Sequence, residues 1–291
     1  MTLRFALFGH PVAHSVSPAI HSAAYRALGL AHRYELCDVP DEPALARAID
    51  AVRSGELAGA NVTVPWKRQA LALSDRSETT AADVGAANVL ARDPAFGVVA
   101  HNTDVMALVE ELGALFPSPA RVLVLGADGA SLAAIAAARA LGARSVGVSS
   151  RRWTEQLETA LWPHTSEIVR LGAELLPWSA EDGPLARFAA RADVIVQATS
   201  AGMHGAGPGE DVARVMPWGL LPKASVAYDL VYNPVDTEFL RRARGAGLVA
   251  KGGLGMLVAQ AARAFELWLG IAPPREPMLE AARAALLARP T

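Results

Sequence analysis

Lysine 67 is a candidate for proton-transfer chemistry because this chain uses lysine rarely. Only three of its 27 basic residues are lysines, namely Lys67, Lys223 and Lys251, and the rest are arginines. A guanidinium stays protonated in almost any protein environment, whereas the pKa of an ammonium group moves readily on desolvation. A lysine can therefore give and take a proton where an arginine cannot. We interpret Lys67 as a candidate catalytic group, with an ordinary surface lysine as the alternative.

Two serines near the amino terminus could bind a carboxylate. Ser15 and Ser17 are two residues apart, in a loop after the first expected strand. Paired hydroxyls beside the start of a helix form a hydrogen-bonding cradle for such an anion. Helix capping by a serine before Pro18 would explain one of the two residues but not both.

Polar residues also precede Lys67 in the chain. Asn61 and Thr63 alternate with valines, so on an extended segment both would point to the same side. A strand end with one polar face is suited to contact a ligand. These two side chains are therefore candidate binding residues.

Asn88 and Asp104 add an amide and a carboxylate to the set of candidate residues. Asn102 or Thr103 is expected to cap the helix that follows them. Asp104, one step further into that helix, would then be free to pair with Lys67. The two charged side chains form the candidate catalytic pair.

Short apolar runs alternate with amphipathic stretches, a pattern typical of an α/β protein with parallel sheets. In the first part of the chain this pattern predicts strands, a strand pair, two helix starts and a longer helix. The strands are 5–8, 33–37 and 60–62, the pair is 87–90 with 98–101, the helices start at Pro18 and Pro43, and the longer helix is 103–115. Pro117-Ser118-Pro119 then indicates a domain boundary.

A βαβ unit follows this boundary. It consists of a buried strand at 121–125, a glycine turn at 126–130, an alanine-rich helix at 131–141 and a strand at 145–149. Further strands are expected at 193–197, 225–229 and 248–250, before a last amphipathic helix at 254–269. The sequence therefore predicts two α/β domains.

The glycine turn is a candidate phosphate site, because backbone amides and the positive end of a helix face an anion there. No acidic residue stands where one would bind the ribose hydroxyls; Ser150, Arg151 and Arg152 follow the second strand instead. Arginine there suits a ribose that carries a 2′-phosphate, which favours NADP(H). Solvated charges at a helix start are the alternative for Arg151 and Arg152.

Asp128 departs from the glycine pattern. It stands where a second glycine would let the backbone approach the pyrophosphate, and it brings a Cβ and a negative charge. Its carboxylate either points away from the phosphates or weakens nucleotide binding.

The composition limits the classes of function. The chain has 291 residues, 52% of them hydrophobic and 19% charged, with a net charge of −2. These values favour a compact globular protein and give no basic footprint for nucleic acid or membrane. A single cysteine excludes an internal disulfide framework. With no expected signal peptide or membrane span, a cytoplasmic protein is expected. The histidines form no ligand cluster, so no metal is expected.

Taken together, seven motifs resemble the shikimate dehydrogenase family. They occur in the order and spacing of that family, from Gly9 to about Gly270. They are His14-Ser15-Val16-Ser17-Pro18, Asn61-Val62-Thr63-Val64-Pro65-Trp66-Lys67, Gly85-Ala86-Ala87-Asn88, Asn102-Thr103-Asp104, Ala198-Thr199-Ser200-Ala201-Gly202-Met203, Tyr228-Asp229-Leu230-Val231-Tyr232-Asn233-Pro234 and Gly253-Leu254-Gly255-Met256-Leu257-Val258-Ala259-Gln260.

The resemblance implies an N-terminal α/β substrate domain, a Rossmann-type doubly wound NADP-binding domain and an active site in the cleft between them. The expected bounds are 1–104 with 253–291 for the substrate domain and 105–252 for the Rossmann domain. Lys67 and Asp104 would be the catalytic pair. Substrate binding would fall to Ser15, Ser17, Asn61, Thr63, Lys67, Asn88, Asp104, Tyr232 and Gln260. Cofactor binding would fall to Gly126, Ala127, Asp128, Gly129, Ala130, Ser131, Ser150, Arg151, Arg152, Thr199, Leu230, Gly253 and Met256.

Three departures from the family pattern lie on the nucleotide side. Asp128 replaces a glycine, Ser150-Arg151-Arg152 replaces Asn-Arg-Thr, and Gln197 replaces an asparagine. The substrate side is intact.

The expected activity is the reversible NADPH-dependent reduction of 3-dehydroshikimate to shikimate in aromatic amino-acid biosynthesis, by a monomer or homodimer. A dehydrogenase of quinate or a related ring acid is one alternative. A ligand-binding paralogue with weakened nucleotide binding, supported by Asp128 alone, is another.

Overall fold

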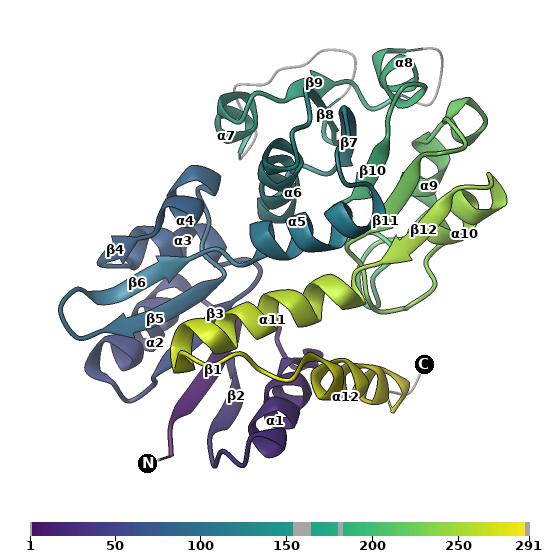
Figure 1. Cartoon of the computed structure of the whole chain (residues 1–291). Coiled ribbons are helices and arrows are strands. Elements are labelled where there is room, and N and C mark those ends of the chain that lie inside the picture. Colours follow the sequence, from purple (N-terminus) through teal and green to yellow (C-terminus); the bar gives the residue numbers. More distant parts are fainter. Residues whose placement is uncertain (1, 154–163, 180–182, 289–291) are drawn as a thin grey trace. The chain divides into compact units, whose positions relative to one another are not determined.

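The computed structural model describes residues 2–153, 164–179 and 183–288. The chain divides into two compact units (Figure 1). The first unit contains Met1–Ala107 and Leu257–Thr291, and the second contains Leu108–Met256. Helices α5 (Asp104–Leu115) and α11 (Leu254–Leu269) each contribute residues to both units.

The first unit is built on a six-stranded mixed sheet in the order β2-β1-β3-β5-β6-β4. Its strands are β1 (Arg4–Gly9), β2 (Arg33–Asp38), β3 (Gly59–Val62), β4 (Arg76–Ser77), β5 (Val89–Asp93) and β6 (Gly97–His101). β1 runs parallel to β2 and β3, whereas β5 is antiparallel to both β3 and β6. The predicted strand pair at 87–90 and 98–101 is therefore confirmed as the hairpin of β5 and β6, and the sheet of this unit is mixed rather than parallel throughout. A short turn, closed by the Asp93 side chain, joins β5 to β6 and so requires antiparallel pairing.

The first unit also contains short and long helices. Besides parts of α5 and α11, they are α1 (Ser17–Ala27), α2 (Glu42–Ser54), α3 (Lys67–Leu73), α4 (Thr79–Val84) and α12 (Arg275–Leu287). The sequence pattern did not predict α12, because the amphipathic helix at 254–269 was expected to be the last one. Pro274 is the N-cap residue of α12, and the buried Met278 and Ala282 belong to this helix, which packs against α1.

The second unit contains a parallel six-stranded sheet in the order β12-β11-β10-β7-β8-β9. Its strands are β7 (Arg121–Leu125), β8 (Ser145–Ser149), β9 (Glu174–Leu176), β10 (Val194–Gln197), β11 (Val226–Asp229) and β12 (Val249–Gly252). The described helices are α6 (Gly129–Ala140), α7 (Thr165–Arg170), α8 (Pro184–Ala189), α9 (Glu210–Val215), α10 (Glu238–Gly245) and the 3₁₀ turn η2 (Trp218–Leu220). Numbered along the chain, the sheet order is 3-2-1-4-5-6, which is that of a Rossmann fold.

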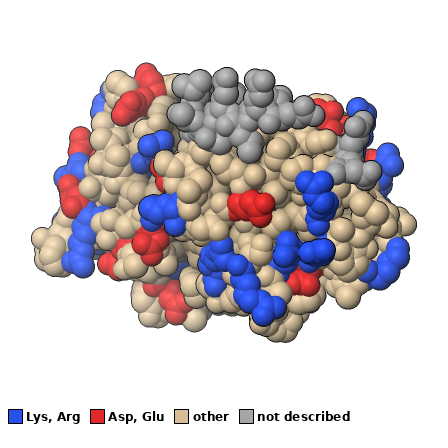
Figure 2. Space-filling model, turned by 90° about the horizontal axis from the view of Figure 1, so that it is seen from above, with Lys and Arg blue, Asp and Glu red and all other residues tan. Residues whose placement is uncertain are grey.

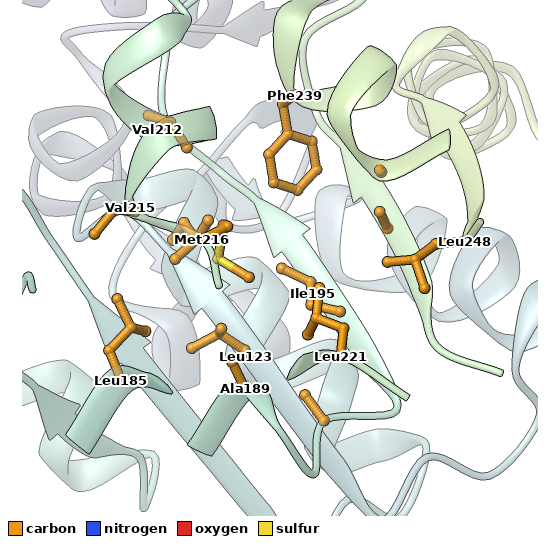
Figure 3. Close-up of a cluster of buried hydrophobic side chains, with 14 of the residues drawn as sticks. Leu123, Leu185, Ala189, Ile195, Val212, Val215, Met216, Leu221, Phe239 and Leu248 are labelled. Carbon is orange, nitrogen blue, oxygen red and sulfur yellow. The ribbon is translucent and has the colours of Figure 1, made fainter. Parts of the chain in front are cut away.

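A cluster of apolar side chains forms a core of the second unit (Figure 3). Leu123 and Ile195 come from neighbouring strands, and Phe239 comes from α10 above them; all three are at most 1% exposed. Burying a side chain of this size contributes roughly 1.5–3 kcal/mol. This packing fixes the strands whose carboxyl ends carry the predicted cofactor residues.

Basic and acidic side chains both occur across the face shown in Figure 2, with wide neutral areas between them. No helix of the described residues is long and apolar enough to cross a membrane. Nor do these residues include a group of three or more His, Cys, Asp or Glu side chains that could hold a metal ion.

Candidate active site

Lys67 is the first residue of α3, which begins shortly after β3 ends. Its backbone carbonyl accepts a hydrogen bond of 2.8 Å from the amide of Ala87. The preceding Trp66 donates its indole N–H to the Val39 carbonyl at 2.7 Å. Both contacts fix the backbone from which the lysine side chain extends.

The predicted pair of Lys67 and Asp104 is present. Lys67 Nζ donates to Asp104 Oδ2 at 2.7 Å, with side-chain exposures of 20% and 8%. Asp104 is the first residue of α5, and Asn102 Oδ1 accepts from the amides of Asp104 and Val105 at 3.1 and 3.3 Å. Asn102 therefore caps α5, as predicted, while the Asp104 carboxylate pairs with the lysine.

Asn88 links this pair to its surroundings. Its Nδ2 donates to Asp104 Oδ1 at 2.8 Å and to Thr103 Oγ1 at 3.0 Å, and its Oδ1 accepts from the Thr103 amide at 2.7 Å. Nδ2 also lies 3.5 Å from Gln260 Oε1. Asp104 Oδ1 thus accepts from the Asn88 side-chain amide, and Asp104 Oδ2 accepts from the Lys67 ammonium group. A partly exposed lysine held in this way can donate a proton to a ligand beside it.

Asn61 lies on β3 and is buried. Its Nδ2 donates to the Asn88 carbonyl at 3.2 Å, and its Oδ1 accepts from the Tyr34 hydroxyl at 2.7 Å. Thr63 directly follows the strand and is half-buried. Asn88 therefore contacts Asp104, Asn61 and Gln260, and Asp104 contacts Lys67. All five residues belong to the first unit.

The predicted serine pair lies at the start of α1. Ser15 Oγ donates to Ser17 Oγ at 3.0 Å and accepts from the Ser17 amide at 3.2 Å. Val16 is the N-cap residue and makes no side-chain capping bond. Neither serine therefore acts as a conventional N-cap. Tyr232, another of the predicted substrate-binding residues, belongs to the second unit and is half-buried.

The predicted cofactor residues lie at the carboxyl ends of the second sheet. Gly126 follows β7, Ser150 follows β8, Thr199 follows β10, Leu230 follows β11 and Gly253 follows β12. All neighbouring strands of this sheet run parallel, so these positions share one edge. In open α/β sheets, ligands bind outside this edge.

Two glycines of this edge cannot carry a side chain. Gly126 has φ +125°, and a Cβ there would lie 2.8 Å from Ser131 Oγ and 3.1 Å from the Ala198 carbonyl oxygen. A Cβ on Gly253 would collide with the Leu230 carbonyl oxygen. By contrast, a Cβ on Gly129 meets nothing within 4 Å. The open space at the first residue of α6 leaves room for an anion at the helix N-terminus, which fits the pyrophosphate of a dinucleotide.

Charged groups surround this turn. Asp128 is the N-cap residue of α6, and its exposed carboxylate makes no capping bond but lies 3.7 Å from the Arg152 guanidinium. Arg151 lies 3.5 Å from Asp211, and the Ser150 Oγ accepts from the Arg152 amide at 3.4 Å. Both guanidiniums remain partly exposed. This set of donors fits the extra phosphate of NADP(H).

The turn after β10 is held by Gln197, one of the departures from the family pattern. Gln197 is fully buried; its Nε2 donates to the Ala201 carbonyl at 3.0 Å, and its Oε1 accepts from the Thr199 amide. Thr199 Oγ1 accepts from the Ala201 amide at 3.1 Å. The glutamine therefore fixes Thr199, one of the predicted cofactor residues. Met256 lies in the first turn of α11 and is half-buried.

Asp229, at the end of β11, is fully buried. Burial raises the pKa of Asp229 to about 6, against the opposing effect of hydrogen bonds from the Thr237 hydroxyl and the Val231 amide. Its carboxylate ties the chain after β11 to the start of α10.

The contacts that three residues make at the site were not predicted from the sequence. Thr103 was expected only as a cap, yet its hydroxyl donates to the Gln260 carbonyl at 3.2 Å. Tyr34 binds Asn61, and Gln197 orders the Thr199 turn. A tyrosine in an expected buried strand was the only available signal for Tyr34; its partner is 27 residues away in the chain.

The fold and the two groups of residues define a dinucleotide-binding α/β protein of the dehydrogenase class. Two family models match the chain: one, described as a shikimate dehydrogenase substrate binding domain, over residues 7–90, and one, described as a shikimate 5'-dehydrogenase C-terminal domain, over residues 253–283. A shikimate dehydrogenase (NADP(+)) of Thermus thermophilus is 39% identical over 287 residues, which cover 98% of this chain and 99% of the relative. The chain therefore belongs to the shikimate dehydrogenase family.

Solved structures agree with this assignment. A shikimate 5-dehydrogenase of Thermus thermophilus, in complex with NADP(H) and shikimate, superposes with a TM-score of 0.82 at 37% identity, covering 98% of this chain and 100% of that one. A quinate dehydrogenase from Corynebacterium glutamicum, in complex with NAD, superposes with a TM-score of 0.81 at 28% identity, covering 97% and 99%.

Proposed function

We propose that this protein catalyses the reversible reduction of 3-dehydroshikimate to shikimate with NADPH. The observation that carries the proposal is the 2.7 Å contact between Lys67 Nζ and Asp104 Oδ2, with Asn88 holding the second carboxylate oxygen. Membership of the family and the similarity to an enzyme solved with NADP(H) and shikimate support the choice of substrate and cofactor.

In the proposed reaction, Lys67 donates a proton to the carbonyl oxygen of the substrate as that oxygen becomes a hydroxyl. NADPH, when bound, supplies the hydride. Asp104 orients the ammonium group and stabilises its charge, because an ion-paired hydrogen bond is short and directional. In the reverse direction, the neutral Lys67 amine accepts the hydroxyl proton.

The remaining predicted residues would bind and orient the substrate. We assign the carboxylate to the Ser15 and Ser17 hydroxyls, with Tyr232 assisting. The ring hydroxyls and the carbonyl are assigned to Asn61, Thr63, Asn88 and Gln260. Amides and hydroxyls suit this task because they both donate and accept hydrogen bonds.

For the cofactor, we assign the pyrophosphate to the turn from Gly126 to Ser131. The adenosine ribose and its 2′-phosphate are assigned to Ser150, Arg151 and Arg152. The nicotinamide is assigned to Thr199, Leu230, Gly253 and Met256. The open space at Gly129 and the two partly exposed guanidiniums support this placement.

Replacing Lys67 tests the catalytic role directly. Loss of a positioned proton donor typically costs ~10²–10⁴-fold in rate, so Lys67→Ala should lower kcat by about that factor. Lys223→Ala is the matched control, because Lys223 Nζ donates to the Ala246 carbonyl and carries no assigned role. Near-normal kcat in a folded Lys67→Ala protein would refute the assignment.

Quinate is the second candidate substrate, because the quinate dehydrogenase of Corynebacterium glutamicum also shares the fold. Two hydroxyls that recognise a carboxylate do not separate the two ring acids. Initial rates with shikimate and quinate, each with NADP⁺ and NAD⁺, give the answer. A higher kcat/KM for quinate than for shikimate would replace the proposed substrate. A higher kcat/KM for NAD⁺ than for NADP⁺ would replace the proposed cofactor.

A binding protein with weak nucleotide affinity is the alternative that Asp128 supports. The carboxylate is exposed and faces Arg152, so it competes with a phosphate for that guanidinium. Titration of NADPH fluorescence at physiological salt decides between the two functions: micromolar binding supports the enzyme, and no binding up to millimolar concentration supports the binding protein. Asp128→Gly should tighten NADPH binding several-fold, because it removes a negative charge near the phosphates.

We further propose that the protein acts in the cytoplasm as a monomer or homodimer. Each chain has a mass of 30.4 kDa. Light scattering after size exclusion should give one or two times this mass.

A further inference from the structure

Tyr34 and His21 form a stacked pair inside the first unit, next to Asn61. Their rings lie parallel, with centroids 4.2 Å apart and planes 5° apart. His21 is 0% exposed and Tyr34 is 7% exposed. Burial lowers the pKa of His21 to about 3, with Asn61 opposing the shift, so the ring is neutral and packs as a flat wall behind the tyrosine.

The Tyr34 hydroxyl donates to Asn61 Oδ1 at 2.7 Å, in buried surroundings. Burial raises the pKa of Tyr34 well above its usual value, so the phenol keeps the proton that it donates. On the other side of the same amide, Asn61 Nδ2 donates to the Asn88 carbonyl at 3.2 Å. The contact with Asn88 identifies the nitrogen and the oxygen of the amide, because a flipped Asn61 would place its oxygen against the Asn88 carbonyl oxygen, and neither atom can donate.

An asparagine amide has two N–H donors and an oxygen with two lone pairs. Asn61 uses one N–H in its bond to the Asn88 carbonyl and one oxygen lone pair in its bond with the Tyr34 hydroxyl. These two bonds leave one N–H and one lone pair of the Asn61 amide unused. The direction of both is fixed by the two existing bonds. Without the phenol, the oxygen would lose the 2.7 Å hydrogen bond that it accepts, and the amide could rotate toward other arrangements.

From these contacts we infer that Tyr34 is a positioning residue, which locks the amide of Asn61 in the orientation that binds a ring hydroxyl of the substrate. The inference rests on the proposed function, because the ligand-binding role of Asn61 belongs to that proposal. Tyr34 itself is assigned no contact with the ligand.

Tyr34 also lies next to the proposed carboxylate site. A hydrogen-bonding interaction with the Ser17 hydroxyl lowers the Tyr34 pKa against the effect of burial, and Ser17 Oγ accepts from Ser15 at 3.0 Å. Tyr34 therefore interacts with Ser17 of the serine pair as well as with Asn61. Asn61 in turn contacts Asn88, which holds Asp104.

Tyr34→Phe tests the inference, because it removes the hydroxyl and keeps the ring on His21. Tyr25→Phe is a matched control: Tyr25 is also buried in this unit, and its hydroxyl has no hydrogen-bond partner among the described residues. A neutral hydrogen bond contributes modestly to binding, so Tyr34→Phe should raise the KM for shikimate about three- to tenfold. It should change kcat less than about twofold and leave the KM for NADP⁺ unaltered. Tyr25→Phe should alter none of these constants.

A double-mutant cycle shows whether Tyr34 acts through Asn61. In an Asn61→Ala background, Tyr34→Phe should have no further effect on the KM for shikimate. An undiminished effect in that background would overturn the inference. So would equal effects of Tyr34→Phe and Tyr25→Phe, which would indicate a general loss of packing.

A measurement without any change at Tyr34 covers the case in which Tyr34→Phe does not fold. The chain has only four tyrosines, so labelling with 3-fluorotyrosine gives few fluorine resonances, which Tyr25→Phe, Tyr228→Phe and Tyr232→Phe assign by elimination. Shikimate should shift the Tyr34 resonance in the wild type but not in Asn61→Ala, and it should leave that of Tyr25 in place. An unshifted Tyr34 resonance on saturation with shikimate would overturn the inference.

Failure of the proposed function gives a different result. In that case the wild type itself neither oxidises shikimate nor binds it by calorimetry. If the wild type turns over shikimate and Tyr34→Phe has wild-type KM, the proposed function stands and the role of Tyr34 is wrong.

Discussion

Asp104 divides its two carboxylate oxygens between an ammonium group and an amide, and this division determines how Lys67 is held. A carboxylate bound only to the lysine could rotate with it, whereas the 2.8 Å bond from Asn88 fixes the plane of the carboxylate. Both groups are largely buried, and removal of one partner would leave a buried charge without compensation. The pairing is therefore a constraint on geometry as well as on charge.

Asp229 should make stability depend on pH. Its pKa is raised from 3.8 in the unfolded state to about 6 by burial, so the folded state binds the proton more tightly. The contribution of Asp229 to the free energy of unfolding is then fully present below pH ~4. It decreases as the pH rises through about 6 and is absent at higher pH. Between pH ~4.5 and ~7.5 the wild type should lose ~2 kcal/mol of unfolding free energy that Asp229→Asn retains.

Urea unfolding at several pH values measures this difference. The readout is the slope of the unfolding free energy against pH, not its absolute value. The absolute value changes as well, because an asparagine offers only one acceptor oxygen to Thr237 and Val231. If the unfolding free energies of the wild type and Asp229→Asn changed in parallel with pH, the predicted titration of Asp229 would be wrong.

At the scale of elements, the start of α5 determines where Asp104 points. Asn102→Ala removes the cap and also the 2.9 Å bond to the Ala86 carbonyl, so it should cost about 1–3 kcal/mol of stability and lower kcat. Asp41→Ala removes the exposed cap of α2, where Asp41 accepts from the Ala44 amide at 2.8 Å. It should cost about 1 kcal/mol and leave kcat unchanged.

Thermal unfolding and steady-state rates on the same two variants separate these effects. Loss of kcat in both variants, or in neither, would mean that the cap of α5 does not position Asp104.

The glycine turn before α6 offers a second matched pair. Gly126→Ala forces a Cβ against Ser131 at φ +125°, and it should destabilise the protein by more than about 1 kcal/mol. Gly129→Ala meets open space at a first helical position, and it should stabilise by roughly 0.4–1 kcal/mol. Both should weaken NADPH binding, the first by distorting the turn and the second by placing a methyl group at the pyrophosphate site.

Chemical denaturation and NADPH titration of both variants test this. Equal stability of the two variants would show that the positive φ of Gly126 is not a constraint.

At the scale of the whole molecule, the division into two units predicts that each ligand stabilises a different part of the chain. A ligand at about 100 times its Kd adds ~2.7 kcal/mol to the state that binds it. NADPH alone should slow amide hydrogen exchange mainly around Gly126 and Arg152. Shikimate alone should slow it mainly around Lys67, Asn88 and Asp104. Hydrogen-exchange mass spectrometry resolves these segments, and the same protection pattern with either ligand would contradict the assignment.

Much of the fold could be predicted from local pattern. The strand at 121–125, the glycine turn and the following helix were recognised because a run of apolar residues, a tight turn and a helical period are all local signals. The antiparallel pairing of β5 with β3 and the helix α12 were not. The direction of a strand depends on its partners, and a helix after two prolines depends on an apolar surface, here that of α1, on which Met278 can be buried.

The sequence by itself determined the motif residues, including Lys67 and Asp104 as a candidate pair, because rare residue types and motif spacing are written in the chain. Only the tertiary structure decided which atoms meet. Asn88 holds Asp104 from 16 residues away, and Tyr34 fixes Asn61 from 27 residues away. Hydrogen bonds between distant segments form only when sheet register brings their atoms within about 3 Å at a suitable angle, and no local pattern encodes that geometry.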